Sequence, residues 1–326
     1  MKPSEWTVGV DFGGTNVKIG LVTATARVHQ TLVIASKQLV TPTAFINGVC
    51  DVVMSLARSV GIRTSQLRGV GVGAPGPVDV TRGMVHSLVN VPGWHNVGLR
   101  RPLERRLKCP CLIDNDANLF TIGEWCAGAG RGAQVLVGLT LGTGVGGGLV
   151  CDGALYRGAS GSAGELGHMV IDADGWRCGC GRRGCLEAHI GTRAILRMAR
   201  EAMRRHHGAL RTLAQRARGG LTPELVSRAA ERGDASARAV WAAMGRSLGI
   251  GLSNIVNALN PDRIVIGGGV AQAWRFFAPA MITTVRAEAM AMPRGAVRIV
   301  RARLGPDAGI IGAAVGLWQD LRTTRR

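Results

Sequence analysis

The chain has 326 residues, of which 40 are Lys or Arg and 21 are Asp or Glu, so its formal net charge is +19. This length exceeds the roughly 250–300 residues at which a single hydrophobic core stops growing, which predicts two domains. A hydrophobic content of 46% excludes a disordered or fibrous chain. An aromatic content of 4% argues against a platform that stacks single-stranded nucleic acid.

Strands and helices are predicted to alternate along the whole chain. In chain order we expect strands at 6–10, 17–22 and 28–35, a helix at 41–60, a strand at 69–73, a helix at 99–107, a strand at 111–113, a helix at 117–127, strands at 135–141 and 145–151, helices at 186–206, 223–232 and 235–258, strands at 263–266 and 297–300, and a helix at 308–321. Two units of strand, glycine-rich turn and strand, at 8–22 and 135–151, indicate two related halves. The pattern predicts an α/β protein of two domains with a cleft.

Neither secretion nor membrane insertion is predicted. The segment Met1–Val10 lacks the basic region and apolar run of a signal peptide. The uncharged stretch Gly132–Cys151 is long enough to span a bilayer, but its many glycines favour two strands around a turn. Three of the eight cysteines lie within Cys178–Cys185, which favours a metal cluster with reduced thiols over a disulfide scaffold. We therefore expect a cytoplasmic protein without a membrane partner.

The positive charge has two interpretations. A nucleic-acid-binding face would account for it, and so would solvated helix faces in a chain biased toward arginine. The arginines are scattered, with local pairs such as Arg100-Arg101 and Arg204-Arg205, and no recognisable nucleic-acid-reading motif accompanies them. Specific nucleic-acid binding is therefore disfavoured, and the reason for the charge is left open by the sequence.

Three glycine-rich loops are candidates for binding phosphate. In the first, Asp11-Phe12-Gly13-Gly14-Thr15-Asn16, the glycines let backbone N–H groups approach an anion, and Asp11 is suited to hold Mg²⁺. An ordinary hairpin turn is the alternative interpretation. The second loop, 141–148, has the same chemistry, and the third, Gly267-Gly268-Gly269, follows a predicted buried strand.

Two common nucleotide-binding motifs do not explain these loops. The G-x-G-x-x-G pattern within 141–148 leads into a strand and not a helix, so a dinucleotide-dependent dehydrogenase is a poor fit. The sequence contains no G-x-x-x-x-G-K-[ST], which excludes a P-loop ATPase.

A dense group of cysteines with one histidine predicts a zinc site. The four candidate ligands are His168, Cys178, Cys180 and Cys185. Three thiolates and an imidazole so close in sequence match a closed tetrahedral Zn²⁺ site. Four protein ligands leave no open position, so the metal would be structural. The alternative is a set of buried cysteines without a metal.

Acidic side chains near predicted turns are candidates for proton transfer and hydroxyl binding. The run Asp114-Asn115-Asp116-Ala117-Asn118 lies between a buried strand and a helix, where polar groups commonly face a cleft. The alternative there is helix capping by Asn115 or Asp116. Glu165 precedes His168 by three residues and Glu187 follows Cys185 by two, so a zinc site would hold both carboxylates in fixed positions. Either glutamate is equally explained as a surface charge.

Seven short segments together carry a family resemblance. They are Gly9-Val10-Asp11-Phe12-Gly13-Gly14-Thr15, Gly73-Ala74-Pro75-Gly76-Pro77-Val78-Asp79, Asn90-Val91-Pro92-Gly93-Trp94, Asp114-Asn115-Asp116-Ala117-Asn118, Leu141-Gly142-Thr143-Gly144-Val145-Gly146-Gly147-Gly148, Gly164-Glu165-Leu166-Gly167-His168 and Cys178-Gly179-Cys180-Gly181-x-x-Gly184-Cys185-Leu186-Glu187. In this order, and across most of the chain, they resemble the ROK family of sugar kinases and repressors. The resemblance implies an actin-like ATPase fold, in which two ribonuclease-H-like domains close a central cleft on sugar and ATP. It implies a small domain of residues 1–117 plus 305–326 and a large domain of residues 118–304.

The resemblance also implies a role for each site residue. Sugar hydroxyls would be bound by Gly76, Asn90, Asn115, Asp116, Glu165, His168 and Glu187. The nucleotide would be contacted by Gly13, Gly14, Thr15, Lys18, Thr143, Gly144 and Gly268. Asp11 would bind Mg²⁺, and Asp116 would be the general base that accepts the proton of the sugar 6-hydroxyl as it attacks the γ-phosphoryl group.

The expected activity is therefore that of an ATP-dependent hexokinase. The segments 73–79 and 90–94 are more similar to the glucokinase branch than to the N-acetylhexosamine branch, so glucose is the expected sugar. N-acetylmannosamine, N-acetylglucosamine and fructose are the alternative sugars, and polyphosphate is the alternative donor. The family's DNA-binding regulators carry an added N-terminal helix-turn-helix, for which a phosphate loop beginning at Asp11 leaves no room. By the same resemblance we expect a homodimer or a dimer of dimers.

Overall fold

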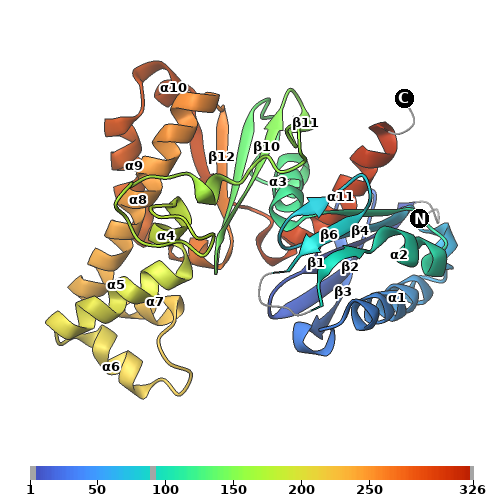
Figure 1. Cartoon of the computed structure of the whole chain (residues 1–326), viewed down its shortest axis with the longest axis horizontal. Coiled ribbons are helices and arrows are strands. Elements are labelled where there is room, and N and C mark those ends of the chain that lie inside the picture. The colour runs from blue at the N-terminus through green and yellow to red at the C-terminus, as the bar shows by residue number, and fades with distance from the viewer. Residues whose placement is uncertain (1–4, 89–92, 324–326) are drawn as a thin grey trace. The chain divides into compact units, whose positions relative to one another are not determined.

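The structure is a computed structural model of the chain, in which residues 5–88 and 93–323 are described (Figure 1). The chain forms two compact α/β units. The first contains Met1–Gly138, Gly148–Gly164 and Ala302–Arg326, and the second contains Leu139–Gly147 and Glu165–Arg301. Among the described residues, no helix is both long enough and apolar enough to cross a membrane.

A five-stranded sheet forms the centre of the first unit. Its strands lie in the order β3-β2-β1-β4-β8. They are β1 (Thr7–Phe12), β2 (Asn16–Val22), β3 (Val28–Ala35), β4 (Gly69–Ala74) and β8 (Cys111–Asn115). β1, β2 and β3 form an antiparallel meander, and β4 and β8 extend the sheet parallel to β1. β1 and β4 are buried along nearly their whole length because helices cover both faces of the sheet.

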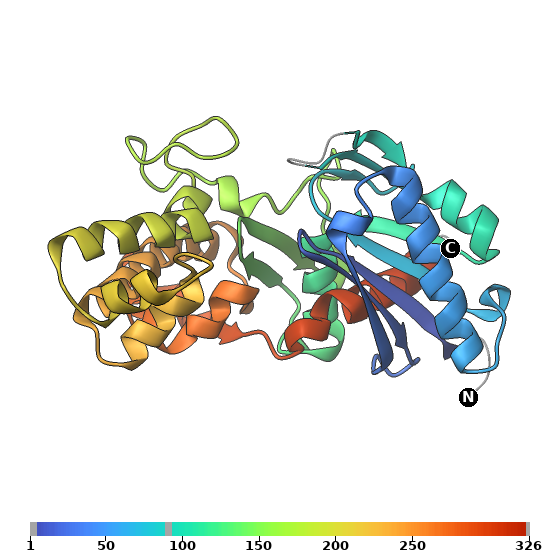
Figure 2. The ribbon, with the colours of Figure 1, turned by 90° about the horizontal axis from the view of Figure 1, so that it is seen from below.

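Two pairs of helices cover this sheet. α1 (Pro42–Ser59) and α2 (Arg100–Leu107) bury one apolar face, while α3 (Asp116–Ala127) and α11 (Ala308–Thr323) form a separate core on the other. Figure 2 shows α11, in red, lying against the strands. The start of α1 is fixed locally, because the Thr41 side chain accepts the N–H of Ala44 and Pro42 supplies the first helical residue.

α11 approaches the sheet at two glycines that lie opposite each other on β1 and β4. Gly9 and Gly71 are paired in register. A Cβ atom at either position would lie 1.9 Å from a backbone oxygen of α11, that of Ile310 or that of Ala313. Real Cβ atoms do not come this close, so any larger residue would push α11 off the sheet. Part of the glycine content therefore serves helix-on-strand packing, a use that the sequence did not predict.

The second sheet repeats the strand order of the first. Its order is β11-β10-β9-β12-β13. If the strands of each sheet are numbered 1 to 5 in chain order, both sheets have the spatial order 3-2-1-4-5. Its strands are β9 (Leu136–Leu141), β10 (Val145–Cys151), β11 (Ala154–Leu155), β12 (Arg263–Gly267) and β13 (Arg298–Arg301). β10 and β11 pair antiparallel and β12 and β13 pair parallel, as at the matching places of the first sheet. The repeat confirms the expectation of two related halves.

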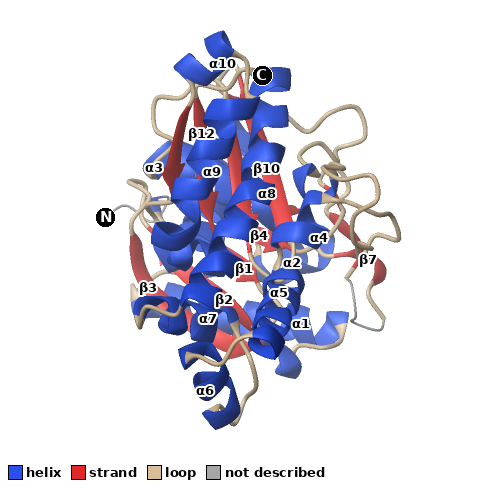
Figure 3. Ribbon diagram, turned by 90° about the vertical axis from the view of Figure 1, so that its left-hand side faces the viewer, coloured by secondary structure: helices blue, strands red, loops and turns tan. Residues whose placement is uncertain are grey.

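Most of the second unit is helical. Its helices are α4 (Leu186–Ile190), α5 (Thr192–Arg205), α6 (Ala209–Arg216), α7 (Pro223–Glu231), α8 (Ala235–Leu259), α9 (Trp274–Glu288) and α10 (Ala291–Ala296). α8 packs along α9, with Trp241 and Phe277 fully buried (Figure 3). The helix expected at 186–206 is two helices, because Gly191 takes an extended conformation between α4 and α5.

Several short elements were not predicted from the sequence. A small antiparallel sheet contains β5 (Val78–Asp79), β6 (Met84–Ser87) and β7 (His95–Gly98). Single-turn 3₁₀ helices occur at Ser36–Gln38, Thr64–Gln66, Leu166–His168, Gly269–Ala273 and Gly305–Asp307. Segments of two to five residues are too short for a hydrophobic period to identify them.

Candidate active site

Asp11 is a half-buried carboxylate near the end of β1. It lies opposite Lys18 of β2 and Gly73 of β4 in register. Burial raises the pKa of Asp11, and the positive charge of Lys18 lowers it in part. A Cβ atom at Gly309, in the first turn of α11, would lie 2.5 Å from the carboxyl carbon of Asp11. The carboxylate therefore sits against a helix N-terminus, which favours negative charge.

Asp116 is a second half-buried carboxylate at the same edge of the sheet. It begins α3 directly after β8 ends. Both carboxylates therefore lie at the carboxyl ends of strands that run parallel. Burial is the main cause that raises the pKa of Asp116 to about 6, and the negative charge of Asp11 adds to the increase. The N–H of Ala117, 2.8 Å from Oδ1, opposes the increase. With a pKa of about 6, Asp116 is ionised at neutral pH and able to accept a proton.

Asn115 links the start of α3 to the turn after β4. Its Oδ1 accepts the backbone N–H groups of Ala117 and Asn118 at 2.9 and 3.2 Å, so Asn115 caps the helix as the capping alternative predicts. Its Nδ2 donates to the carbonyl oxygen of Gly76 at 3.1 Å. One side chain therefore fixes two segments that the sequence marks as sugar-binding candidates.

An ion pair beneath Asp116 was missed by the sequence analysis. Asp114 is fully buried, and its Oδ2 accepts a hydrogen bond from the Arg157 guanidinium at 2.5 Å. Its Oδ1 accepts the N–H of Asn115 and the Nδ2 of Asn118 at 2.7 and 3.1 Å. The position of Asp114 at the end of a predicted buried strand was a sequence signal for an ion pair, because a buried carboxylate needs a cationic or hydrogen-bonding partner. The identity of that partner, 43 residues away, depends on the tertiary fold.

The first glycine loop is a hairpin turn with an open outer side. Ser36 Oγ donates to the carbonyl oxygen of Gly13 at 2.7 Å, which holds the turn from its inner side. Gly14 and Thr15 are exposed, and the space beside Gly14 is empty to 4 Å. Lys18 Nζ donates to a backbone oxygen at 3.3 Å. The backbone of this loop is therefore a hairpin turn, as the alternative interpretation predicts, and the open side of the turn has room for an anion.

The second glycine loop, between β9 and β10, is held by the carboxylate of Glu187. Oε2 of Glu187 accepts the N–H of Val145 at 2.9 Å, and a Cβ atom at Gly144 would lie 2.5 Å from the same oxygen. Thr192 donates from both its N–H and its hydroxyl to the carbonyl oxygen of Gly142, at 3.0 and 2.9 Å. The loop is therefore fixed by α4 and α5 of its own unit.

Thr143 and Gly268 are two further candidates for binding the nucleotide; Thr143 belongs to this loop, and Gly268 lies beside its first residue. Thr143 is exposed at its tip. Gly268 has a φ of +86°, and a Cβ atom there would lie 2.3 Å from the carbonyl oxygen of Leu141, where the loop begins. Glycine at 268 is therefore required both by its backbone conformation and by close approach of two chain segments.

The four predicted zinc ligands converge in the second unit. The ligand atoms of His168, Cys178, Cys180 and Cys185 all lie within 4.8 Å of one another. The sulfurs of Cys180 and Cys185 are 3.7 Å apart, and Cys178 Sγ is 3.6 Å from His168 Nδ1. Ligands on a tetrahedral zinc with Zn–S of about 2.3 Å and Zn–N of about 2.0 Å would be about 3.8 Å (S to S) and about 3.5 Å (S to N) apart. The donor set and its spacing therefore fit Zn²⁺.

The glutamates beside the cluster occupy different environments. Glu187 Oε1 lies 3.4 Å from Cys178 Sγ, so this side chain joins the cysteine cluster to the second glycine loop. Glu165 is mostly exposed, with Oε2 3.9 Å from His168 Nε2. Of the remaining sugar candidates, Asn90 lies outside the described residues. The first unit therefore gathers Gly76, Asn115 and Asp116, and the second gathers Glu165, His168 and Glu187.

Comparison with known proteins assigns the family. The ROK family model matches residues 7–320, and the chain belongs to the ROK family. It is 37% identical over 312 residues to the glucokinase of Halalkalibacterium halodurans, covering 94% of this chain and 93% of that protein. It is 35% identical over 310 residues to the glucokinase of Thermotoga maritima, covering 94% and 95%.

A solved structure extends the similarity to three dimensions. The ROK family glucokinase of Streptomyces griseus, in complex with glucose and AMPPNP, matches with a TM-score of 0.83 and 31% identity, covering 96% of this chain and 99% of that chain. The fold is therefore that of the ROK sugar kinases, with two actin-like ATPase-fold domains. This confirms the fold expected from the sequence.

Proposed function

We propose that this chain is a glucokinase, which transfers the γ-phosphoryl group of ATP to the 6-hydroxyl of glucose. Two glucokinases at 37% and 35% identity, each matched over 94% of this chain, support the choice of sugar. The similar Streptomyces griseus enzyme, with its glucose and AMPPNP, supports the choice of substrates. The single observation that carries the chemistry is the pair of half-buried carboxylates, Asp11 and Asp116, at one edge of the first sheet, both with raised pKa values.

Asp116 is the proposed general base. Its carboxylate stays ionised at neutral pH, and it would accept the proton of the 6-hydroxyl as that oxygen attacks phosphorus. Asn115 and the Asp114–Arg157 pair would hold it in place from the start of α3. Asp11 would hold Mg²⁺, which when bound neutralises phosphate charge.

Substrate contacts are proposed on the remaining residues. The sugar would be bound by Gly76, Asn90, Asn115, Asp116, Glu165, His168 and Glu187, and the nucleotide by Gly13, Gly14, Thr15, Lys18, Thr143, Gly144 and Gly268. Gly14 and Thr15 are exposed residues in a glycine turn, where backbone N–H groups suit phosphate oxygens. The contact between Gly268 and Leu141 supports a nucleotide role for this region, because it places the third glycine loop beside the second.

His168, Cys178, Cys180 and Cys185 are the proposed ligands of a structural Zn²⁺. The ligand spacing supports this role. The backbone N–H of Arg182 lowers the pKa of Cys180 to about 6, which favours the thiolate that a metal requires. Because Glu187 contacts both Cys178 and the N–H of Val145, a bound metal would also fix the position of the second glycine loop.

Two organisational features are also proposed. The small domain would contain residues 1–117 plus 305–326, and the large domain residues 118–304.

The protein would form a homodimer or a dimer of dimers, which light scattering after size-exclusion chromatography measures directly. A monomer at micromolar concentration would contradict that proposal.

A coupled assay of a panel of sugars and donors tests the activity. We expect the highest kcat/KM for glucose with ATP, and lower values for N-acetylmannosamine, N-acetylglucosamine and fructose. Polyphosphate in place of ATP tests the donor. A higher kcat/KM for an N-acetylhexosamine or fructose would overturn the assignment of glucose, and a higher rate with polyphosphate would overturn that of ATP.

A further inference from the structure

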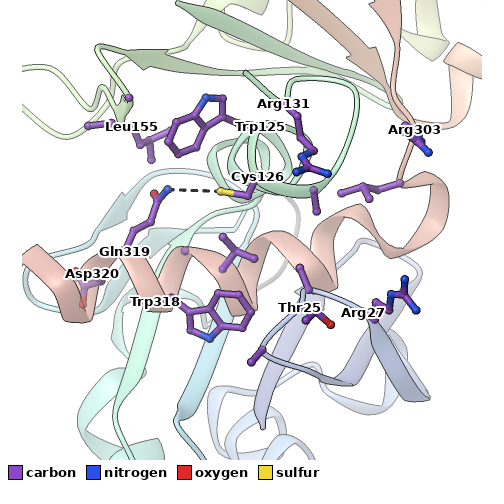
Figure 4. Close-up of a pocket in the computed structure, with 18 of the residues that line it drawn as sticks. Thr25, Arg27, Trp125, Cys126, Arg131, Leu155, Arg303, Trp318, Gln319 and Asp320 are labelled. Atoms are coloured by element: carbon purple, nitrogen blue, oxygen red, sulfur yellow. Dashed lines mark hydrogen bonds between the residues drawn. The ribbon is translucent and has the colours of Figure 1, made fainter. Parts of the chain in front are cut away.

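A large pocket in the first unit lies outside the proposed active site. Its volume is about 1110 Å³, which is ample for a small organic ligand. The turn between β2 and β3, the C-terminal end of α3, β11 with the loop that follows it, and the second half of α11 line the pocket (Figure 4). We call it the α3–α11 pocket, and it includes Arg27, Trp125, Arg131, Arg157, Arg303 and Trp318.

The pocket and the catalytic carboxylates lie at opposite ends of the same elements. β2 begins at the first glycine loop, and the turn that follows its last residue, Val22, lines the pocket. α3 begins at Asp116, and Trp125 near its other end lines the pocket. Nine helical steps of 1.5 Å separate these two residues by about 14 Å. A ligand in the pocket would therefore be distinct from the sugar and the nucleotide of the proposed reaction.

The lining carries an excess of positive charge. Four arginines and a single carboxylate, that of Asp320, are among the lining residues. Arg27 and Arg303 are exposed and lie toward the same side in Figure 4, away from Trp125 and Leu155. Several guanidinium groups in the lining of one concave surface favour a ligand with a phosphoryl or carboxylate group.

Arg157 connects this surface to the buried interior. One edge of its guanidinium binds Asp114, the carboxylate that fixes the start of α3. Its Nε is buried and has no hydrogen-bond acceptor among the described residues. A guanidinium carries five N–H donors in a planar fork, so Arg157 is able to bind an anion and Asp114 together. The anion would then contact the partner of Asp114, and Asp114 lies two residues before Asp116 in the chain.

Two indole rings supply flat apolar surface to the same pocket. The Nε1 of Trp125 donates to the carbonyl oxygen of Ala133 at 2.8 Å, and that of Trp318 donates to Thr7 Oγ1 at 2.7 Å. Both indole donors are therefore used within the protein. The guanidinium of Arg68 lies over one face of the Trp318 ring, 5.2 Å from its centre, so the rings offer a ligand only the carbon surface that remains. A planar ring stacks well on such a surface.

We propose that the α3–α11 pocket is a second ligand site and that it binds a nucleoside phosphate. The arginines would bind its phosphate, and an indole would stack against its base. The combination of several guanidinium groups and two indole rings in one lining selects this class over inorganic anions and over sugar phosphates, which lack a planar ring.

Calorimetric titration with the active site already filled tests the proposal. The protein is saturated with glucose, Mg²⁺ and AMPPNP, and AMP, GMP, UMP and CMP are then titrated separately, with inorganic phosphate and glucose 6-phosphate as comparison ligands. We expect at least one nucleotide to bind, at least about tenfold more tightly than either comparison ligand. The double variant Arg27→Gln/Arg303→Gln should weaken that binding at least about tenfold, because each exchange removes a charge-assisted contact.

A matched double variant separates this effect from loss of net charge. Arg216→Gln/Arg218→Gln removes the same charge from exposed positions in the second unit and should leave nucleotide binding unchanged. The proposal is overturned if no nucleotide binds at millimolar concentration, if glucose 6-phosphate or phosphate binds equally well, or if the two double variants weaken binding alike. Binding is measured without turnover, and the comparison of the two double variants assigns it to the pocket whether or not glucose and AMPPNP occupy the proposed active site.

Discussion

Replacing Asp116 by Asn tests the catalytic proposal most directly, because the exchange removes a charge and almost nothing else. The Asn side chain has the same shape and keeps an Oδ1 that accepts the N–H of Ala117. α3 therefore keeps its first-turn hydrogen bonds. The general base is lost, and we expect kcat for glucose phosphorylation to fall by at least about 100-fold.

The same variant should stabilise the ligand-free protein at neutral pH. Burial and the negative charge of Asp11 raise the pKa of Asp116 from 3.8 to about 6, so the fold favours its protonated form. At 1.36 kcal/mol per pH unit, this difference corresponds to about 3 kcal/mol. The contribution of Asp116 to the free energy of unfolding is complete below pH 3.8 and is lost as the pH rises through about 6.

Two measurements on the variant therefore move in opposite directions. Without Mg²⁺ or nucleotide, urea unfolding should show Asp116→Asn more stable than wild type at pH 8, by up to about 3 kcal/mol, with the difference shrinking toward pH 4. Coupled kinetics should show the loss of kcat, and Asp174→Asn at an exposed site should change neither quantity. Near wild-type turnover in Asp116→Asn would remove this residue from the mechanism, and a variant less stable at pH 8 would refute the burial argument.

Three further perturbations test the surroundings of the site. Arg157→Met leaves the carboxylate of Asp114 buried without its cation and should lower the free energy of unfolding by about 3 kcal/mol in urea; an unchanged midpoint would show that the pair contributes nothing. Removing zinc with a chelator should weaken glucose binding before ATP binding in calorimetry, because two proposed sugar contacts depend on the cluster: His168 is one of its ligands and Glu187 contacts Cys178. An unchanged Kd for glucose would show that the cluster does not organise the sugar site. Gly312→Ala places a Cβ atom 1.8 Å from a backbone oxygen of α3 and should lower stability by about 2 kcal/mol or more, whereas Gly219→Ala in open space should not; equal effects would contradict the packing argument.

The sequence identified the chemistry-bearing segments because each depends on local geometry. The strand and glycine-turn pattern predicted both hairpins, since a tight turn between two strands is encoded within a few residues. The spacing of His168, Cys178, Cys180 and Cys185 predicted their convergence for the same reason, as their ligand atoms lie within 4.8 Å. The capping role of Asn115 was also foreseeable, because a cap bonds to residues two and three positions later.

What the sequence left undetermined depends on segments that meet only after folding. The pairing of Asp114 with Arg157 and of Gly9 with α11 joins residues far apart in the chain, so no local pattern reveals them. The raised pKa of Asp116 depends on burial and on its proximity to Asp11, which the parallel order of β1, β4 and β8 creates.

The sequence by itself thus determined two domains, the glycine loops and the residues that bear the chemistry, while the +19 charge had no assigned use. Only the tertiary structure gathers Arg27, Arg131, Arg157 and Arg303 around one pocket. These arginines come from four separate segments, and a shared surface between them exists only once the chain is folded. The physical reason is that turns and caps are set by neighbouring residues, whereas burial, ion pairing and pockets are set by which segments the fold brings together.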